Sequence, residues 1–196
     1  LVFRTNINSF YSILEIARRC ESVVIYASSA ATYGNVDYPQ QEGREKPENP
    51  YGFSKLAMDR IAHHFVEIHN MKVFGLRYFN VYGPREYYKK RTSSMVLQLG
   101  CQILAGDSPR LFIGSDGIFR DFVYVEDVIQ ANLRACVSDV PGVYNVGSGR
   151  SRSFQDIADI LLRELGSNLS VEYFENPYLD YQGHTQAHLE KSEKIL

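Results

Sequence analysis

The feature that most constrains the fold is the order of an apolar strand, a long helix pattern and a second strand. Residues 23–27 form a short apolar run that is typical of a buried parallel strand. Residues 51–70 place apolar side chains at helical spacing, and residues 72–78 return to a strand-like pattern. Strands joined through a helix run parallel, because only a long crossover connects them. The sequence therefore predicts an α/β fold on a parallel sheet. The predicted apolar stripe of the helix is Phe53, Leu56, Ala57, Ile61, Phe65 and Ile68.

The alternation continues downstream with shorter elements. Ser153 and Asp156 have the spacing of a capping box at the start of the last long helix. Because the elements after about residue 90 are shorter and more mixed, we expect a smaller lobe there, partly interwoven with the first. The predicted strands lie at residues 111–113, 119–125, 142–146 and 171–174, and the helices at residues 93–106, 126–137 and 154–165.

Both ends of the chain fall where a domain is not expected to stop. The first residues lead directly into a helix pattern, and residues 185–196 end within another. We therefore expect an internal fragment of a longer protein, truncated at the C-terminus.

Composition narrows the class of protein. A formal net charge of -2 gives no electrostatic argument for nucleic acid, and no apolar run is long enough to cross a membrane. Cys20, Cys101 and Cys136 are scattered, which favours reduced, packed thiols in a cytoplasmic protein. His184 and His188 have metal-ligand spacing on a helical pattern, but no third ligand accompanies them, so no metal site is predicted.

Tyr51 and Lys55 are the first candidates for chemistry. They lie four residues apart, so a helix places phenol and ammonium on one face. A nearby cation and the positive end of a helix both favour the ionised form of a phenol, which suits proton exchange with an alcohol. Ser28 and Ser29 follow the first strand, at the edge where α/β sheets bind ligands. Chance spacing is the alternative explanation for the pair.

The glycine-rich turn of dinucleotide-binding proteins is missing before the first helix. Gly147, Ser148 and Gly149 come late and follow a different strand, so we interpret them as a turn rather than a phosphate cradle. A cofactor-binding turn would therefore lie upstream of this chain.

Several motifs in order resemble one superfamily. SSAATYG at residues 28–34, YGFSK at 51–55 and RYFNVYGPR at 77–85 are similar to the nucleotide-sugar epimerases and dehydratases of the extended short-chain dehydrogenase/reductase superfamily. RDFVYVED at residues 120–127 and YNVGSG at 144–149 continue the resemblance. It implies a Rossmann-like doubly wound parallel sheet, incomplete here, with a smaller α/β substrate-binding lobe. Residues 1–90 would be the C-terminal part of the dinucleotide-binding domain, and residues 91–196 mainly the substrate-binding lobe.

Within that branch the chain most resembles the ADP-glyceromanno-heptose 6-epimerase family, in AATY at residues 30–33, RE at 85–86 with Lys89, LFIGS at 111–115, YQ at 181–182 and TQA at 185–187. This resemblance implies inversion of C6'' of an ADP-heptose used for the lipopolysaccharide inner core. The implied route is oxidation to a ketone, followed by return of hydride to the opposite face.

The resemblance also implies roles for the catalytic residues. Tyr51 would be one acid/base, tuned by Lys55, and Ser29 would hydrogen-bond the reacting oxygen. Lys89 matches the second acid/base position. Such a position is needed because a ketone that presents its opposite face requires a proton donor on another side. A solvated basic loop that grips diphosphate is the alternative for Lys89 to Arg91. Cofactor contacts are implied for Asn6, Tyr51, Lys55, Val81 and Lys89.

Substrate contacts follow from the same match. A turn role is the alternative for Asn80, a helix cap for Asn6, and a salt bridge to Asp121 or Asp127 for Arg120. Arg120 suits phosphate because its planar fork donates in pairs. The implied substrate-binding residues are Ser29, Asn80, Gln98, Phe112, Ile113, Gly114, Ser115, Arg120 and Tyr181.

The cofactor, the partner and the oligomeric state are also expectations from the sequence. The resemblance implies NADP, with NAD possible, because the residue that reads the ribose lies upstream. We expect a nucleotide sugar as the partner, no nucleic acid or membrane, and a homo-oligomer. A UDP-hexose 4-epimerase is the alternative enzyme, and a non-catalytic nucleotide-binding relative is the alternative class. The fragment alone is expected to be inactive.

Overall fold

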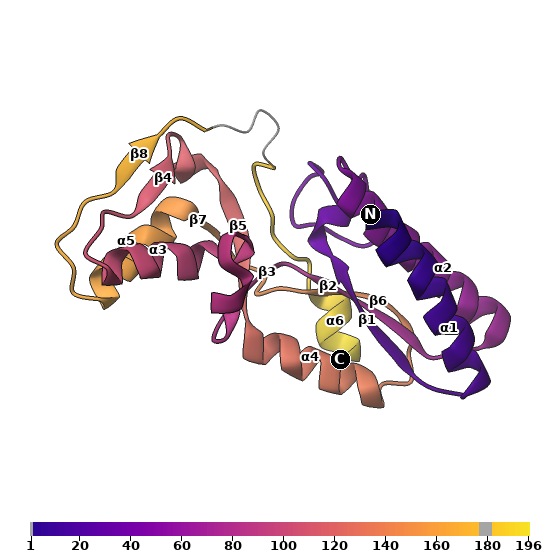
Figure 1. The fold of residues 1–196 in the computed structure, drawn as a ribbon. Helices are drawn as coiled ribbons and strands as arrows, with labels where there is room; N and C mark the ends of the chain where they lie inside the picture. Colours follow the sequence, from indigo (N-terminus) through magenta and orange to yellow (C-terminus); the bar gives the residue numbers. More distant parts are fainter. Residues whose placement is uncertain (1, 177–181) are drawn as a thin grey trace.

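The computed structural model describes residues 2–176 and 182–196, and helices and strands alternate along the chain (Figure 1). Labels with η mark short π-helical or 3-10 segments. The elements are η1 (Arg4–Asn8), α1 (Ser9–Arg19), β1 (Val24–Ser29), η2 (Ala30–Thr32), α2 (Pro50–His69), β2 (Val73–Tyr78), β3 (Asn80–Tyr82), η3 (Glu86–Thr92), α3 (Met95–Leu104), β4 (Arg110–Phe112), η4 (Ser115–Gly117), β5 (Phe119–Tyr124), α4 (Val125–Val137), β6 (Gly142–Val146), β7 (Ser151–Ser153), α5 (Phe154–Glu164), β8 (Glu172–Phe174) and α6 (Glu190–Ile195).

A parallel sheet of order β1-β2-β6 carries the first part of the molecule. Helices α1 and α2 lie together on one face, where Phe10, Met58 and Phe65 form a core with strands β1 and β2. Helices α4 and α6 lie on the other face, packed on Phe74 and Tyr144. Helices on both faces make this a doubly wound α/β sheet, which confirms the predicted fold class.

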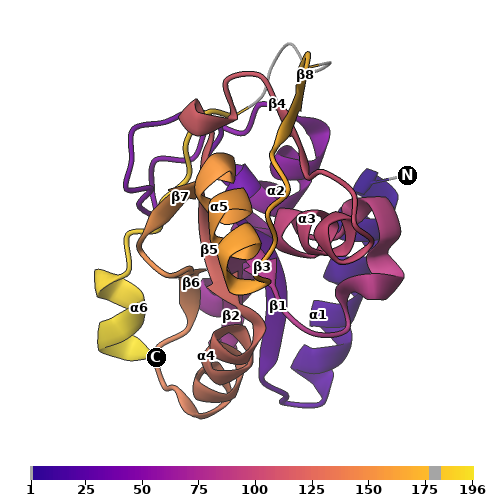
Figure 2. The ribbon, with the colours of Figure 1, turned by 90° about the vertical axis from the view of Figure 1, so that its left-hand side faces the viewer.

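The second part of the molecule is a smaller α/β lobe. Strand β5 pairs in parallel with β3 and antiparallel with β7, and a separate two-stranded sheet joins β4 and β8. Helices α3 and α5 pack beside these strands around Leu99 and Phe154, and they face the viewer in Figure 2. Strand β6 and helices α4 and α6 return to the first sheet, so the chain crosses between the two parts more than once. A division near residue 90 stays a prediction.

Helix α2 buries part of the face that its apolar pattern predicted. Phe65 is buried and Ile61 packs against the core, but Phe53 is 55% exposed and Ile68 63% exposed. The buried face also carries Met58, Ala62 and Asp59, and the partners of Asp59 lie on two strands. The predicted stripe is therefore correct in its middle and wrong at both ends.

The capping box was predicted correctly, because Ser153 and Asp156 form it at the start of α5. Ser94 caps α3 by accepting the Leu97 N–H. Strand β3 and segment η3 were not predicted, because residues 79–91 read as irregular from their glycine and proline.

Two further predictions were wrong. His184 and His188 lie in an extended segment that bridges Gln40 and Phe119, and only residues 190–195 form a helix there. The cysteines are free, as predicted, but exposed rather than packed. Within residues 2–176 and 182–196, no group of three or more potential metal ligands gathers, and no helix combines the length and apolar character of a membrane span.

Candidate active site

Ser29 ends strand β1 and begins the turn η2. Its Oγ accepts the Ala31 N–H at 3.1 Å, and its carbonyl accepts the Thr32 hydroxyl at 2.8 Å. The side chain is partly exposed, and its role as an acceptor leaves the hydroxyl hydrogen free to donate to a ligand. Ser29 therefore lies at the carboxyl edge of the parallel sheet, where the sequence placed it.

The first turn of α2 lies against this serine turn. Asn49 caps the helix by accepting the Gly52 N–H at 2.8 Å, and Pro50 begins it. A Cβ on Gly52 would lie 2.3 Å from the Ala31 carbonyl oxygen, so only glycine permits this approach. The close contact brings Tyr51, which is 46% exposed, to the same region as Ser29.

Lys55 links α2 to strand β1. Its Nζ donates to the Ala27 carbonyl at 2.8 Å and lies 5.8 Å from the centre of the Tyr51 ring. Burial lowers the pKa of Lys55, and the Asp59 carboxylate one turn away partly offsets this. Phenol and ammonium thus share one face of the helix, as their spacing predicted.

Asn6 reaches the same helix turn from η1. Its side-chain N–H donates to Ser54 Oγ at 2.9 Å, and the Ser54 hydroxyl donates to the Tyr51 carbonyl at 2.7 Å. Asn6 lies inside a π-helical segment rather than at a cap, so the helix-cap alternative is wrong. Such segments are rare and often occur at functional sites.

The donor set here fits a nicotinamide nucleotide. Lys55 donates one hydrogen bond within the described residues, so two of its N–H groups are available to a ribose. Ser28 is buried, and its hydroxyl has no partner in the part of the chain that the structure describes. A buried polar group without a partner costs stability unless a ligand or water satisfies it.

Strand β3 begins immediately beyond the end of β2. Asn80 is the first residue of β3 and pairs with Phe122 of β5, which places it in a strand rather than a turn. Val81 packs against the core between the sheet and α4. Both residues are partly buried, and their predicted contacts with sugar and cofactor stay predictions.

Five of the predicted substrate-binding residues, Phe112 to Ser115 and Arg120, lie in or beside β4, η4 and β5. Phe112 lies edge-on to Phe174 at 4.9 Å, Ile113 is exposed, and Gly114 adopts a positive φ of 80°. Ser115 is buried, and its hydroxyl has no partner among the described residues. This strand end therefore presents an exposed apolar residue and an unsatisfied hydroxyl.

Arg120 lies in the same region but faces the backbone. Its guanidinium donates to the carbonyls of Phe119, at 2.6 Å, and Gln182, and it lies over the Phe154 ring. The Asp121 carboxylate is engaged elsewhere, by Ser148, Gly149 and Ala187, which argues against the proposed Arg120–Asp121 salt bridge.

The Gly147–Gly149 segment is a turn, as predicted. Its Ser148 and Gly149 N–H groups donate to Asp121 at 2.6 and 2.9 Å, so both amides are engaged within the protein. Gly149 has a positive φ of 71°, which a turn of this kind requires. The segment therefore holds a carboxylate of the chain itself.

Lys89 lies in η3, half exposed, with its Nζ 3.9 Å from Glu86 Oε2. Glu86 is buried and accepts N–H groups from Gly83 and Ser94. Within the described residues, Lys89 makes no hydrogen bond or ion pair with Ser29, Tyr51 or Lys55. Gln98, in α3, donates to the Ser93 carbonyl at 2.7 Å. Tyr181 lies outside the described residues.

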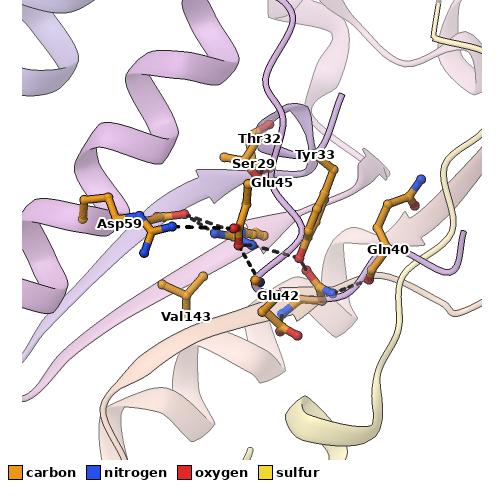
Figure 3. Close-up of polar contacts among 12 residues, drawn as sticks. Ser29, Thr32, Tyr33, Gln40, Glu42, Glu45, Asp59 and Val143 are labelled. Carbon is orange, nitrogen blue, oxygen red and sulfur yellow. Dashed lines mark hydrogen bonds and ion pairs between the residues drawn. The ribbon is translucent and has the colours of Figure 1, made fainter. Parts of the chain in front are cut away.

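Sequence reasoning missed a buried polar network behind the serine turn (Figure 3). Its centre is Arg77 in β2, which contacts Asp59, Glu45 and Tyr33. An arginine inside an apolar strand was the signal that could have revealed the network, because a buried charge requires polar partners.

A family model described as "NAD dependent epimerase/dehydratase family" matches residues 1–147, three quarters of the chain. The chain belongs to this family. The resemblance inferred from the motifs is thereby confirmed.

Solved structures of this epimerase/dehydratase family match over nearly the whole chain. An ADP-L-glycero-D-manno-heptose-6-epimerase from Helicobacter pylori is 47% identical, with a TM-score of 0.88, covering 98% of this chain and 59% of that one. A UDP-N-acetylglucosamine 4-epimerase from Methanobrevibacter ruminantium is 29% identical, with a TM-score of 0.92, covering 98% and 62%. A Thermus thermophilus UDP-glucose 4-epimerase in complex with NAD is 26% identical, with a TM-score of 0.83, covering 98% and 64%. This chain thus spans about three fifths of the length of these proteins.

Proposed function

We propose that the full-length protein is an NADP-dependent ADP-glycero-manno-heptose 6-epimerase that acts in lipopolysaccharide inner-core heptose biosynthesis in the cytoplasm, as a homo-oligomer. The observation that carries the proposal is the packing of Tyr51 and Lys55 against the Ser29 turn at the carboxyl edge of the sheet. The 47% identity to a heptose epimerase supports the choice of sugar.

In this proposal the chain's own residues move protons. Tyr51 takes the proton of the C6'' hydroxyl, and Ser29 donates a hydrogen bond to that oxygen as it becomes a carbonyl. Lys55 holds the nicotinamide ribose and favours the charged phenolate. NADP held by Lys55 and Asn6 would supply the redox chemistry, its oxidised form serving as the acceptor and its reduced form as the donor of one hydride at C6''.

Lys89 gives the proton to the carbonyl oxygen of the turned ketone in our proposal. The second acid is required because the oxygen then points away from Tyr51. Half exposure and a long ion pair to Glu86 leave the ammonium free to reorient. The substrate's diphosphate would lie near Ile113 to Ser115 and Arg120.

A UDP-sugar 4-epimerase is the second candidate function. The superposition on the Methanobrevibacter enzyme, with a TM-score of 0.92, is the observation that favours it. Such an enzyme would use Ser29, Tyr51 and Lys55 but would not need Lys89.

A substrate panel separates these candidates. The full-length protein is incubated with ADP-heptose, UDP-glucose and UDP-N-acetylglucosamine, and stereochemistry is followed by NMR. We expect inversion of ADP-heptose alone, and a loss of about 10²- to 10⁴-fold in Tyr51→Phe. Turnover of a UDP-sugar without turnover of ADP-heptose would contradict the proposed substrate. Full activity of Tyr51→Phe would contradict the proton relay.

A further inference from the structure

The serine turn and helix α2 are both linked to one buried guanidinium, that of Arg77. Arg77 lies in β2 and is 2% exposed. Its Nε and Nη2 donate to Asp59 Oδ2 at 3.0 and 2.8 Å. Its Nη1 donates to Glu45 Oε1 at 2.6 Å and to the Tyr33 hydroxyl at 3.0 Å. A single side chain therefore holds three segments of the chain together (Figure 3).

Each of these partners belongs to a segment that carries or supports the site. Asp59 lies one helical turn beyond Lys55 on α2. Tyr33 follows Ser29 by four residues, directly after η2. Glu45 belongs to the segment that leads into the cap of α2. Arg77 thus ties the serine turn and the tyrosine helix to the same strand.

Tyr33 is fixed from its other side as well. The residue is fully buried, and its hydroxyl donates to Asn145 Oδ1 in β6 at 2.7 Å. Asn145 in turn donates to the carbonyls of Gln40 and His188. Burial raises the pKa of Tyr33, so the phenol is neutral and able to donate. With no exposed surface, it cannot touch substrate.

We infer that Tyr33, held by Arg77 and Asn145, is a positioning residue that fixes Ser29 relative to Tyr51. This inference rests on the proposed function. A shift of about 1 Å in a reacting group costs as much as 10²-fold in rate, so one buried hydroxyl suffices to matter. Arg77 itself is a poor target, because its loss would leave Asp59 and Glu45 buried without a cation.

The test compares two buried tyrosines in the full-length enzyme. Tyr33→Phe removes the hydroxyl described above. Tyr144→Phe is the matched control, because Tyr144 is also fully buried and donates its hydroxyl to the Val140 carbonyl. Tyr33→Phe loses two hydrogen bonds, the one donated to Asn145 Oδ1 and the one accepted from Arg77 Nη1, whereas Tyr144→Phe loses one. We expect kcat to fall at least tenfold in Tyr33→Phe, with KM within threefold of the wild type, and kcat to stay within twofold in Tyr144→Phe.

A double mutant separates positioning from general weakening. If Tyr33 acts through Ser29, adding Tyr33→Phe to Ser29→Ala should lower kcat by less than twofold more. Losses that multiply, or equal losses in the two single Tyr→Phe variants, would overturn the inference.

An activity-independent measurement keeps this result distinct from the proposed function. The Ala31 amide donates to Ser29 Oγ, so its hydrogen exchange reports on the serine turn. We expect faster Ala31 exchange in Tyr33→Phe and unchanged exchange in Tyr144→Phe. If the wild type inverts no sugar, the proposed function fails while this comparison still decides the positioning role. Unchanged Ala31 exchange in Tyr33→Phe would overturn it.

Discussion

Lys55 combines a half-buried amine with a direct contact to the strand that carries Ser29. Its Nζ donates to the Ala27 carbonyl, two residues before Ser29, and lies 5.8 Å from the centre of the Tyr51 ring. Burial disfavours the ammonium form, and Asp59 favours it. The contact with the strand thus holds a lysine of lowered pKa beside the Tyr51 ring.

The titration of Lys55 can be measured directly. In protein labelled with ¹³C at lysine Cε, the Lys55 resonance, assigned through its loss in Lys55→Arg, should titrate with a midpoint below 10.5. The direction follows because burial outweighs the nearby carboxylate. A midpoint at or above 10.5 would show that the amine is not desolvated as described.

Spacing alone located Tyr51, Lys55 and Ser29, because helical period and strand ends are local properties of sequence. Spacing could not predict the tertiary contacts that hold these three residues in place. Asp59 and Arg77 are eighteen positions apart, and only the folded sheet brings them together. The contact of Asn6 with Ser54 joins positions even further apart. Local pattern also did not predict the backbone beside Lys89, where Lys90 has a positive φ of 52°.

At the level of elements, the site depends on the packing of α2 against η2. Apolar periodicity predicted the extent of α2 correctly but its buried face only in part, because Ser54 and Asp59 lie inside with polar partners. Periodicity counts such residues as exposed. Likewise, the segment at residues 182–189 has helical spacing but is extended, because it bridges to Gln40 and Phe119.

Two glycine substitutions test the packing of α2. Gly52→Ala places a Cβ 2.3 Å from the Ala31 carbonyl oxygen, so α2 must shift from the serine turn. We expect at least a tenfold loss of kcat and a lower free energy of unfolding in urea denaturation. Gly100→Ala in α3 is the control, because its Cβ would have no described atom within 4 Å apart from its chain neighbours and its own helix backbone.

The control should gain about 0.5–1 kcal/mol of stability, since alanine favours a helix interior. It should leave kcat unchanged. Equal effects of the two substitutions would contradict the role assigned to the close approach at Gly52.

At the scale of the whole molecule, the proposed site would draw on both parts of the fold. Strand β1 and helix α2 carry Ser29, Tyr51 and Lys55, and the smaller lobe carries Ser115 and Arg120. The alternation of elements predicted both parts from sequence. The return of β6, α4 and α6 to the first sheet depends on contacts between distant segments, and local patterns only suggested it. In the proposed function, the sugar nucleotide would bind across these two parts, with its reacting carbon beside the sheet edge.

The fate of the hydrogen on C6'' tests the central claim most directly. The full-length protein is given ADP-heptose carrying deuterium at C6'', in ordinary water, and the inverted product is analysed by NMR and mass spectrometry. Oxidation and return of hydride within one site predict that the inverted carbon keeps its deuterium. Inversion with hydrogen from solvent at C6'' would contradict the account, because it would mean that the carbon loses a proton rather than a hydride.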